Sequence, residues 1–424
     1  MAKPRLLSLN SYHYRRGGSD AVYFEQDQMF REQGWDTGFF SMHHPSNDPS
    51  EWSKYFIDEL EFGGDYGLLD KLSMAGKVIY SLEAKKKMNQ LIDDWRPDIA
   101  HAHCIYHHLS PSALAALKDR GVPTVMTAHD LKLACPAYKM LNSNGICEKC
   151  KGGNLLHVVK NRCLHGSLAV STLVMVESAV HKMFGMYKNN LDKIVAPSRF
   201  FEKKLIEWGW PQEKLVYIPN NIDTSHYEPQ HQVGDYLFYF GRLAPEKGVA
   251  TLLKAASQAG VKLHLAGTGP IEAELKQLAS ELGCDATFHG FCKKDEFLPM
   301  LNNARAVVLP SEWYENAPMS VLEAYALGKI VIGADIGGIP EMIEEGETGY
   351  LFESGNQQAL SEAIETVFSK TDDQLVSMGR TAREYVATKF TAQKYYESMA
   401  ALYTELGAGS EAIADKQVTS AAIY

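Results

Sequence analysis

Two cationic side chains lie close together in the segment GRLAPEKG, residues 241–248. Arg242 offers a planar guanidinium fork and Lys247 a compact point charge, so the two suit adjacent phosphate groups. The alternative is a surface loop with two solvated cations. The apolar run DYLFYF precedes the segment and a helical pattern follows it, which predicts a loop at the end of a strand.

A second candidate segment, PSEWYENAPMSVLEA at residues 310–324, also leads from an apolar run into a helical pattern. Carboxylates such as Glu315 and Glu323 can accept hydrogen bonds from sugar hydroxyl groups, as an acidic residue does for ribose in dinucleotide-binding folds. Backbone N–H groups at the predicted helix start, near Met319, can bind an anionic phosphate. The competing interpretation of Glu323 is a carboxylate that only complements the helix dipole.

His129 ends the apolar run VPTVMTAHD, residues 122–130. A single histidine is more often structural than catalytic. Ligand-binding residues of open α/β sheets lie at strand ends, however, and this position favours a functional role. The segment AHAHCIYHH, residues 100–108, holds four more histidines. They either face a molecule that accepts a transferred group or are ordinary polar residues.

These motifs resemble those of the family-four glycosyltransferases of the GT-B fold. The resemblance is carried by GRLAPEKG, by the sequence from Pro310 to Phe352, and by the shorter motifs GGSD, TAHD, APS and IPNNID in the first 223 residues. It covers nearly the whole chain except the tail and residues 130–187. The order and spacing of the motifs along the chain make the resemblance specific.

The resemblance implies a role for each residue. Arg242 and Lys247 would hold the donor diphosphate, Glu323 the ribose and Glu315 the donor sugar, with His129 beneath that sugar. The other residues that it implies for donor binding are Gly17, Gly18, Gly267, Gly269, His289, Gly290, Phe291, Asn316, Ala317, Pro318, Met319, Ser320 and Val321.

The implied reaction is sugar transfer from a nucleotide-diphosphate donor, a UDP- or GDP-sugar, to a glycan or lipid-linked glycan. The family retains anomeric configuration, and the resemblance is greatest to bacterial capsule, lipopolysaccharide and exopolysaccharide enzymes. No Asp-x-Asp pair occurs in the chain, so we expect no catalytic metal. The alternatives are a non-catalytic sugar-nucleotide-binding or assembly protein, and another GT-B enzyme such as a nucleotide-sugar epimerase.

Two α/β domains must position these motifs. Apolar runs that predict strands are RLLSLN, DTGFFSM, PDIAHAHC, VPTVMTAHD and KIVAPS in the first half, and DYLFYFGR, VKLHLAG, ATFHGF, ARAVVLPS and KIVIGAD in the second. They alternate with helical stretches such as Glu246–Ala259, which predicts two Rossmann-like doubly wound domains facing a central cleft. We assign the N-terminal, acceptor-binding domain to residues 1–222 and the nucleotide-sugar-binding domain to residues 223–386. We predict a C-terminal helix at 387–406 that packs back on the domains, and a flexible tail at 407–424.

Four of the seven cysteines fall in an insertion-like stretch at residues 131–183. Cys135, Cys147, Cys150 and Cys163 include one Cys-x2-Cys pair, which fits a structural zinc site or, alternatively, four free thiols. An odd number of cysteines without a secretion signal predicts a cytoplasmic protein.

The 424 residues carry a net charge of −10, which argues against a nucleic-acid partner. Basic residues exceed acidic ones by two up to residue 225, whereas acidic residues exceed basic ones by twelve beyond it. No apolar stretch is long enough to span a bilayer. Arg15–Arg16 and Lys85–Lys87, with apolar residues such as Trp52, Leu68 and Leu69, suggest peripheral contact with an anionic membrane, or else a solvated surface.

Overall fold

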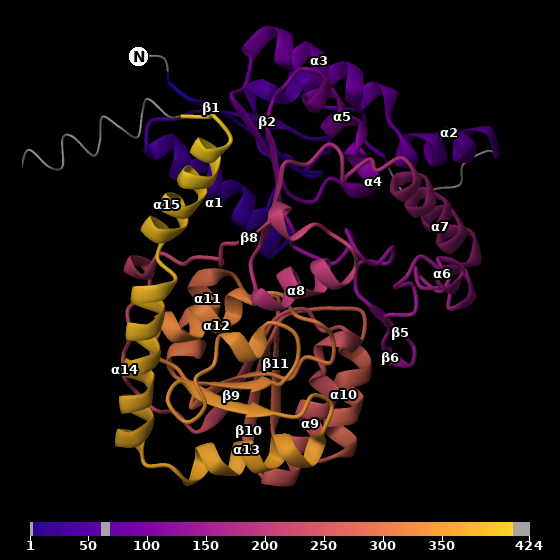
Figure 1. Cartoon of the computed structure of the whole chain (residues 1–424). Helices are drawn as coiled ribbons and strands as arrows, with labels where there is room; N and C mark the ends of the chain where they lie inside the picture. Colours follow the sequence, from indigo (N-terminus) through magenta and orange to yellow (C-terminus); the bar gives the residue numbers. More distant parts are fainter. Residues whose placement is uncertain (1–2, 61–67, 410–424) are drawn as a thin grey trace, which may run out of the picture.

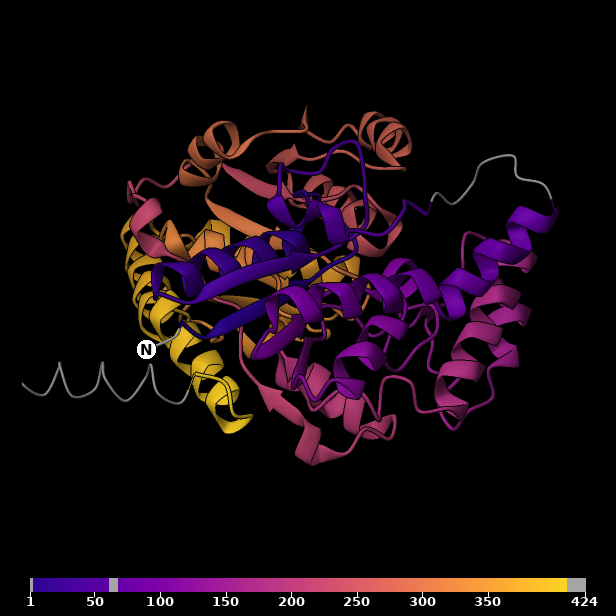
Figure 2. The same ribbon diagram turned by 90° about the horizontal axis from the view of Figure 1, so that it is seen from above.

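The computed structural model describes residues 3–60 and 68–409, and of residues 68–72 it describes the backbone alone. Two six-stranded sheets, one in each half of the chain, form the frame of the molecule (Figures 1 and 2). Every strand pair within these two sheets is parallel. The predicted doubly wound α/β fold is confirmed. The predicted tail lies outside the described residues from residue 410 onwards.

The first sheet has the strand order β2-β1-β3-β4-β7-β8. Its strands are β1 (Arg5–Leu9), β2 (Asp36–Phe40), β3 (Ile99–Ala102), β4 (Thr124–Thr127), β7 (Lys193–Ala196) and β8 (Leu215–Tyr217). Five of them lie in the apolar runs identified in the sequence. The edge strand β8 was not predicted, because its three residues form no apolar run long enough to be recognised.

Helices connect these strands and cover the sheet. They are α1 (Gly18–Glu32), α2 (Leu68–Ile79), α3 (Leu82–Trp95), α4 (Tyr106–Leu109), α5 (Ser112–Asp119), α6 (Leu156–Lys160), α7 (Leu168–Met183) and α8 (Arg199–Glu207), with the 3-10 turns η1 (Glu51–Tyr55) and η2 (Gln212–Lys214). The insertion contributes α6, α7 and a short antiparallel pair, β5 (Leu141–Asn142) and β6 (Gly145–Ile146).

The second sheet has the strand order β11-β10-β9-β12-β13-β14. Its strands are β9 (Tyr236–Phe240), β10 (Lys262–Ala266), β11 (Ala286–Gly290), β12 (Ala306–Leu309), β13 (Val331–Ala334) and β14 (Gly349–Phe352). The first five lie in the predicted runs. The edge strand β14 was missed, because its four residues follow a polar turn and only two of them are buried.

The second half contains the helices α9 (Val249–Ala259), α10 (Glu272–Glu281), α11 (Lys294–Asn302), α12 (Met319–Ala326), α13 (Gln357–Ser369), α14 (Asp372–Lys389) and α15 (Ala392–Glu405), and the 3-10 turns η3 (Thr224–His226), η4 (Pro245–Lys247) and η5 (Ile339–Glu341). The helical stretch predicted at Glu246–Ala259 begins at Val249 in the structure. Gly248 separates η4 from α9, because its φ of +66° is in the left-handed region.

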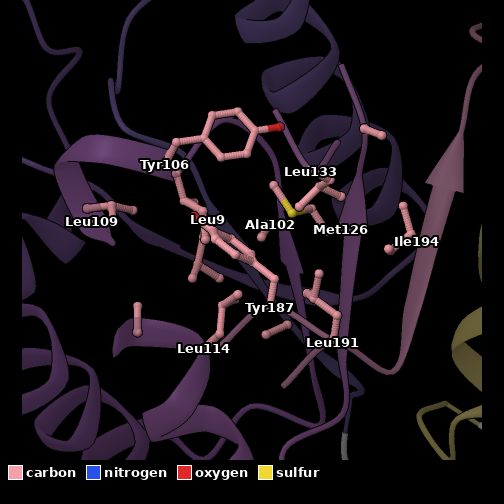
Figure 3. Packing of buried hydrophobic residues seen from close by; sticks show 14 of the residues in the cluster. Leu9, Ala102, Tyr106, Leu109, Leu114, Met126, Leu133, Tyr187, Leu191 and Ile194 are labelled. Atoms are coloured by element: carbon pink, nitrogen blue, oxygen red, sulfur yellow. The ribbon is translucent and has the colours of Figure 1, made fainter. Parts of the chain in front are cut away.

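Separate hydrophobic clusters line the two faces of the first sheet. Leu7, Leu9 and Met126 point to one face and pack against α3 and α5, as Figure 3 shows for part of this cluster. Leu6 and Val125, their neighbours along the same strands, point to the other face. Burial on both faces explains why the strands appear in the sequence as nearly continuous apolar runs.

The last two helices join the halves of the molecule. Helix α14 lies along the second sheet, and α15 continues onto the N-terminal half (Figure 1). Residues 387–406 are therefore the end of α14, a two-residue break at Phe390–Thr391, and α15. Tyr395 and Tyr403 of α15 are buried against Leu6 and its cluster.

We expect Tyr403→Phe to lower the free energy of unfolding by about 1–3 kcal/mol. The Tyr403 hydroxyl is 2.6 Å from Nδ1 of His101 and 3.1 Å from Nε2 of Gln26, and all three side chains are buried. The substitution leaves the two polar partners unsatisfied, and urea denaturation measures the loss.

The matched control is Tyr396→Phe on the same helix. Tyr396 packs against Phe30 with ring centroids 5.1 Å apart and has no hydrogen-bond partner among the described residues. Its hydroxyl should therefore be dispensable. Equal losses in the two variants would contradict a specific role of the Tyr403 hydrogen bonds.

Candidate functional site

Side chains from the carboxyl ends of β3 and β4 form a row of three histidines. Nε2 of His129, two residues beyond β4, is 2.8 Å from Nδ1 of His103. The rings of His103 and His129 stack with centroids 5.1 Å apart, and those of His101 and His103 with centroids 4.8 Å apart. His101 contacts the hydroxyl groups of Thr127 and Tyr403. The row connects His129 to helix α15.

Burial keeps the three imidazoles neutral. It lowers the pKa of His129 to about 4 and that of His101 to about 3, and it holds the pKa of His103 well below its usual value. One of the two facing nitrogens of His103 and His129 must donate and the other accept. Nε2 of His103 is buried without a partner among the described residues. His129, which is partly exposed, is thus a neutral hydrogen-bonding group at pH 7.

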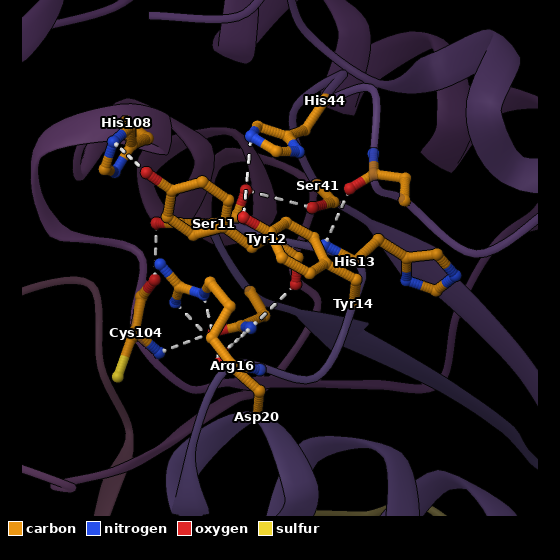
Figure 4. A network of polar contacts seen from close by, with 12 residues as sticks. Ser11, Tyr12, His13, Tyr14, Arg16, Asp20, Ser41, His44, Cys104 and His108 are labelled. Atoms are coloured by element: carbon orange, nitrogen blue, oxygen red, sulfur yellow. Dashed lines mark hydrogen bonds and ion pairs between the residues drawn. The ribbon is translucent and has the colours of Figure 1, made fainter. Parts of the chain in front are cut away.

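The loop between β1 and α1 is held by a polar network (Figure 4). Asn10 and Arg16 both donate to the buried carboxylate of Asp20, at 2.9 Å and 3.1 Å. The loop ends at Gly17 and α1 begins at Gly18, and an added Cβ at either residue would meet nothing within 4 Å. Neither glycine has a positive φ, so the protein itself does not require glycine at these positions.

In the second half, Lys247 and Glu315, both predicted to contact the donor, form an ion pair. Nζ of Lys247 is 2.6 Å from Oε1 of Glu315, and the same oxygen accepts a hydrogen bond from Ser311 at 2.7 Å. Arg242 is exposed, and its guanidinium has no hydrogen bond or ion pair with the described residues. Arg242 is therefore available to a ligand, whereas Lys247 must share or leave Glu315 to bind one.

Glu323 lies in α12 and is partly shielded by neighbours from both halves. Its Oε1 accepts a hydrogen bond of 3.4 Å from the hydroxyl of Tyr227. Burial raises the pKa of Glu323 to about 7; the charge of Lys294 opposes this shift, and that of Glu25 in α1 adds to it. A partly protonated carboxyl group can both donate and accept hydrogen bonds.

Asn316 joins the second half of the chain to the His129 loop. Its Nδ2 donates to the carbonyl oxygen of Ala128 at 2.9 Å, and its Oδ1 accepts from Ser198 at 2.9 Å. The next residue, Ala317, accepts a hydrogen bond from Asn220 at 2.9 Å. The segments that the sequence predicts to bind the donor and to lie beneath its sugar are therefore direct neighbours.

The start of α12 is open to an anion. Its N-cap residue, Pro318, makes no side-chain capping bond, which leaves the N–H groups of Met319 and Ser320 without a capping acceptor. Val321 differs, because its N–H already donates to the oxygen of Pro318 at 3.1 Å and its side chain is buried. Val321 therefore contributes to the core that supports this helix start.

Glycines allow three loops of the second sheet to pack together. The N–H of Gly267 donates to the oxygen of Gly290 at 2.6 Å. A Cβ at Gly267 would lie 1.9 Å from the oxygen of Gly241, and one at Gly269 would lie 2.1 Å from the oxygen of Leu243. Glycine is thus required at 267 and 269 by the protein itself, to support the GRLAPEKG loop.

The end of β11 is exposed beside these loops. Phe291 presents most of its side chain to solvent. Nε2 of His289 is 3.3 Å from Nδ1 of His264, on the neighbouring strand β10. Both residues remain predicted parts of a base-binding surface.

The insertion reaches the second half of the chain. Nζ of Lys139 is 2.6 Å from Oε1 of Glu246, within GRLAPEKG. Glu148 accepts hydrogen bonds from Tyr314 at 3.0 Å and from Lys204 at 2.7 Å. The sequence did not predict these contacts, because nothing in its pattern pairs residues that lie so far apart.

The four cysteines of the insertion are reduced and close to one another. The charges of Cys135, Cys163 and Cys147 add to the effect of burial in raising the pKa of Cys150 to about 11. Among the described residues, however, no three His, Cys, Asp or Glu side chains are already arranged to hold a metal ion. The zinc site stays a prediction.

The residues expected to contact a membrane are largely engaged within the protein. Arg16 and Lys85 lie 3.1 Å and 2.7 Å from carboxylate oxygens, and Trp52 packs against the core. The side chains of residues 68–69 lie outside the described residues. Within the described ranges, no helix is both long enough and apolar enough to cross a bilayer.

Taken together, these groups suit a ligand with an anionic end and several hydroxyl groups. Arg242, Lys247 and the start of α12 can bind the negative charge. Glu315, Glu323 and the neutral His129 can hydrogen-bond hydroxyl groups.

Two family matches cover most of the chain. Residues 16–226 match the family described as Glycosyltransferase Family 4, and residues 226–385 match Glycosyl transferases group 1. Among named relatives, the N-acetyl-alpha-D-glucosaminyl L-malate synthase of Bacillus anthracis is 23% identical over 92% of this chain and 94% of its own. The lipopolysaccharide 1,2-N-acetylglucosaminetransferase of Salmonella typhimurium is 27% identical over 50% of this chain and 62% of its own.

Solved structures share the fold. The sucrose-phosphate synthase of Thermosynechococcus elongatus superposes with a TM-score of 0.69 at 20% identity, covering 95% of this chain and 99% of its own. Anabaena HepE in complex with UDP gives a TM-score of 0.66 at 18% identity, covering 95% and 100%. Both support the GT-B arrangement of two Rossmann-like halves.

The raised pKa of Glu323 predicts a pH-dependent effect of Glu323→Gln on the ligand-free protein. A carboxyl group with a pKa near 7 when folded and 4.5 when unfolded destabilises the fold increasingly as pH rises through that window. The glutamine variant should therefore gain stability over the wild type by about 2 kcal/mol more at pH 8 than at pH 5. Urea denaturation at both pH values measures the gain.

Glu365→Gln is the control, because Glu365 is exposed on α13 and makes no hydrogen bond or ion pair with the described residues of the site. Its effect should stay the same at both pH values. An effect of Glu323→Gln that is equally independent of pH would show that the carboxyl group is not shifted.

Proposed function

The chain belongs to the family-four glycosyltransferases of the GT-B fold, and we propose that it transfers a sugar from a nucleotide-diphosphate donor to a glycan or lipid-linked glycan, retaining the anomeric configuration. The relative named for lipopolysaccharide synthesis supports a role in assembling a cell-surface polysaccharide. The solved neighbour that holds UDP supports a nucleotide-sugar donor, with UDP- and GDP-sugars as the two candidates.

One observation carries the proposal: Asn316 holds the predicted donor segment against the His129 loop. Lys247, Glu315 and the start of α12 belong to the second half of the chain, whereas His129 belongs to the first. A transferase needs the donor's leaving group and its reacting sugar carbon held at the same time, because orientation supplies much of the rate enhancement. The hydrogen bonds of Asn316 meet this requirement.

Arg242 and Lys247 would stabilise the departing nucleotide diphosphate. The bond between the sugar's anomeric carbon and the phosphate oxygen breaks, and its electron pair leaves with the diphosphate. Arg242 has no competing carboxylate at hydrogen-bond distance among the described residues, and Lys247 would move from Glu315 towards the new charge. Fixed cations aimed at developing charge lower the barrier, so we propose that transfer needs no catalytic metal.

The remaining residues would orient the sugar and its nucleotide. Glu323 would bind the ribose and Glu315 the donor sugar, while the loops at residues 267–270 and 289–291 would face the base. Neutral His129 would hydrogen-bond a sugar hydroxyl. The acceptor hydroxyl would attack from the face that the diphosphate leaves, and this attack on the same face retains the configuration. The proton of the hydroxyl would pass to a phosphate oxygen.

We propose that the enzyme works in the cytoplasm, at the inner face of the cell membrane. Its cysteines are free among the described residues, which supports a reducing compartment.

We expect Lys247→Ala and Arg242→Ala each to lower kcat at least a hundredfold, because each removes a charge that stabilises the leaving group. Released nucleotide is measured with UDP- and GDP-sugars, and NMR of the product gives the anomeric configuration. Glu315→Ala should also abolish turnover. A thermal-shift screen against UDP, GDP and ADP identifies the base beforehand, since a bound nucleotide raises Tm by linkage.

Lys254→Ala on α9 is the matched control: Lys254 is an exposed lysine outside the site. It should keep wild-type turnover. Wild-type rates in the Lys247 and Arg242 variants would refute the site assignment, and inversion at the anomeric carbon would refute the retaining mechanism.

We also propose that Cys135, Cys147, Cys150 and Cys163 bind a structural zinc ion. To bind zinc, the four thiolates would have to move closer together than they are in this structure. The bound ion would then stabilise the insertion. Elemental analysis should find about one zinc per chain, and Cys147→Ser should lose it. Cys284→Ser, outside the insertion, should keep it. Zinc-free protein whose Tm is unchanged by chelator would exclude the site.

A further inference from the structure

Helix α7 turns an apolar stripe towards solvent. Five exposed residues follow one another at spacings of four, four, three and four, which places them on one face of the helix: Leu168, Thr172, Val176, Ala179 and Met183. Leu168 is 54% exposed and Met183 is 72% exposed. No charged residue interrupts the stripe.

Two further large apolar side chains are exposed on or directly beside helices α6 and α7. Leu156 of α6 is 67% exposed, and Phe184, directly after α7, is 60% exposed. Helices α6 and α7 pack together and lie on the right-hand side of Figure 1, outside the first sheet. We call the stripe, Leu156 and Phe184 the α6–α7 surface. Single exposed apolar residues are ordinary, whereas a row of them marks an interaction surface.

The segment that carries this surface is strongly basic, although the chain as a whole has a net charge of −10. Between residues 149 and 190 there is one acidic residue, Glu177, and it is fully buried. The same segment has six exposed basic residues: Lys149, Lys151, Lys160, Arg162, Lys182 and Lys188. Lys160 and Arg162 lie shortly before α7 in the sequence. Neither has an ion-pair partner among the described residues.

The inner face of α7 is fixed to the predicted active site. Glu177 lies 2.9 Å from Nζ of Lys132 and 2.9 Å from Nδ1 of His107. Although burial opposes it, the charges of Lys132 and His107 lower the pKa of Glu177 to about 2, so the pair with Lys132 is ionised at neutral pH. Lys132 follows His129 by three residues. A partner bound to the outer face of α7 is thus held in a fixed relation to the His129 loop.

We propose that the α6–α7 surface docks the protein on an anionic lipid membrane, with the apolar stripe in the interface and the basic side chains on the headgroups. An exposed apolar face flanked by lysine and arginine is the pattern of helices that lie in a membrane interface. A second copy of this chain fits less well, because two such surfaces would bring like charges together, those of Lys160 and Arg162 among them. Only the further consequence, that a lipid-linked acceptor reaches His129 from this side, rests on the proposed function.

The experiment is co-sedimentation of the full chain with vesicles. We expect binding to vesicles of equal parts phosphatidylglycerol and phosphatidylcholine at low salt, and weak binding to phosphatidylcholine alone. Binding should fall sharply at about 1 M salt, where the Debye length is about 3 Å. Lys160→Glu with Arg162→Glu should weaken binding at least tenfold, since each basic residue near an anionic surface contributes about fivefold. Val176→Asp with Met183→Asp should weaken it at least as much.

Matched controls come from α3. Leu82 is 75% exposed and Lys86 is exposed without a partner among the described residues, so Leu82→Asp with Lys86→Glu makes the same kinds of change elsewhere. This variant should bind vesicles like the wild type. All three double variants should keep wild-type turnover of a water-soluble acceptor.

Three results would overturn the proposal: no sedimentation at low salt, equal losses in the α3 control, or a dimer in light scattering that Val176→Asp with Met183→Asp abolishes. The last would assign the surface to a second copy. Vesicle binding without any glycosyl transfer would refute the proposed function and leave the docking surface standing, so the two failures are distinguishable.

Discussion

In parallel sheets covered by helices on both faces, ligands bind at the carboxyl ends of the strands, where loops lead into helix starts. This constraint decides where the candidate site lies. His129 follows β4, Arg242 follows β9, and Glu315 follows β12. Each of these loops leads from the end of a strand into the next helix, so helix starts such as that of α12 lie at the same edge and add their N–H groups to it.

Within that edge, charge is controlled by burial. The row from His101 to His129 is kept neutral because charged imidazoles would lose their hydration. Glu315 is buried, and one of its carboxylate oxygens accepts hydrogen bonds from both Lys247 and Ser311. Arg242 is exposed and has no ion-pair partner among the described residues. An incoming diphosphate can therefore bind Arg242 directly, whereas Lys247 must be drawn from its ion pair with Glu315.

The halves of the molecule are joined by elements that the sheets do not require. Helix α15 returns from the second half to the first, where Tyr403 contacts the same histidine row that ends at His129. The insertion extends from the first half to the second, where its Lys139 forms an ion pair with Glu246. Its helix α7 is tied by Glu177 to the residues that follow His129. A change at the outer surface of the insertion therefore lies only a few contacts from the predicted chemistry.

The sequence by itself determined the α/β class, ten of the twelve strands of the two large sheets, and the residue types at the site, because local periodicity and motif spacing are properties of neighbouring residues. Short edge strands such as β8 were not predicted, because they are too short to show a periodic pattern. Only the tertiary structure decided that Lys247 pairs with Glu315 and that His103 lies behind His129. It also showed that Gly267 is required by contact with Gly241 and that Arg16 forms an ion pair with Asp20. Most of these contacts join residues that are far apart in the chain. Which side chains meet depends on how the sheets and helices pack.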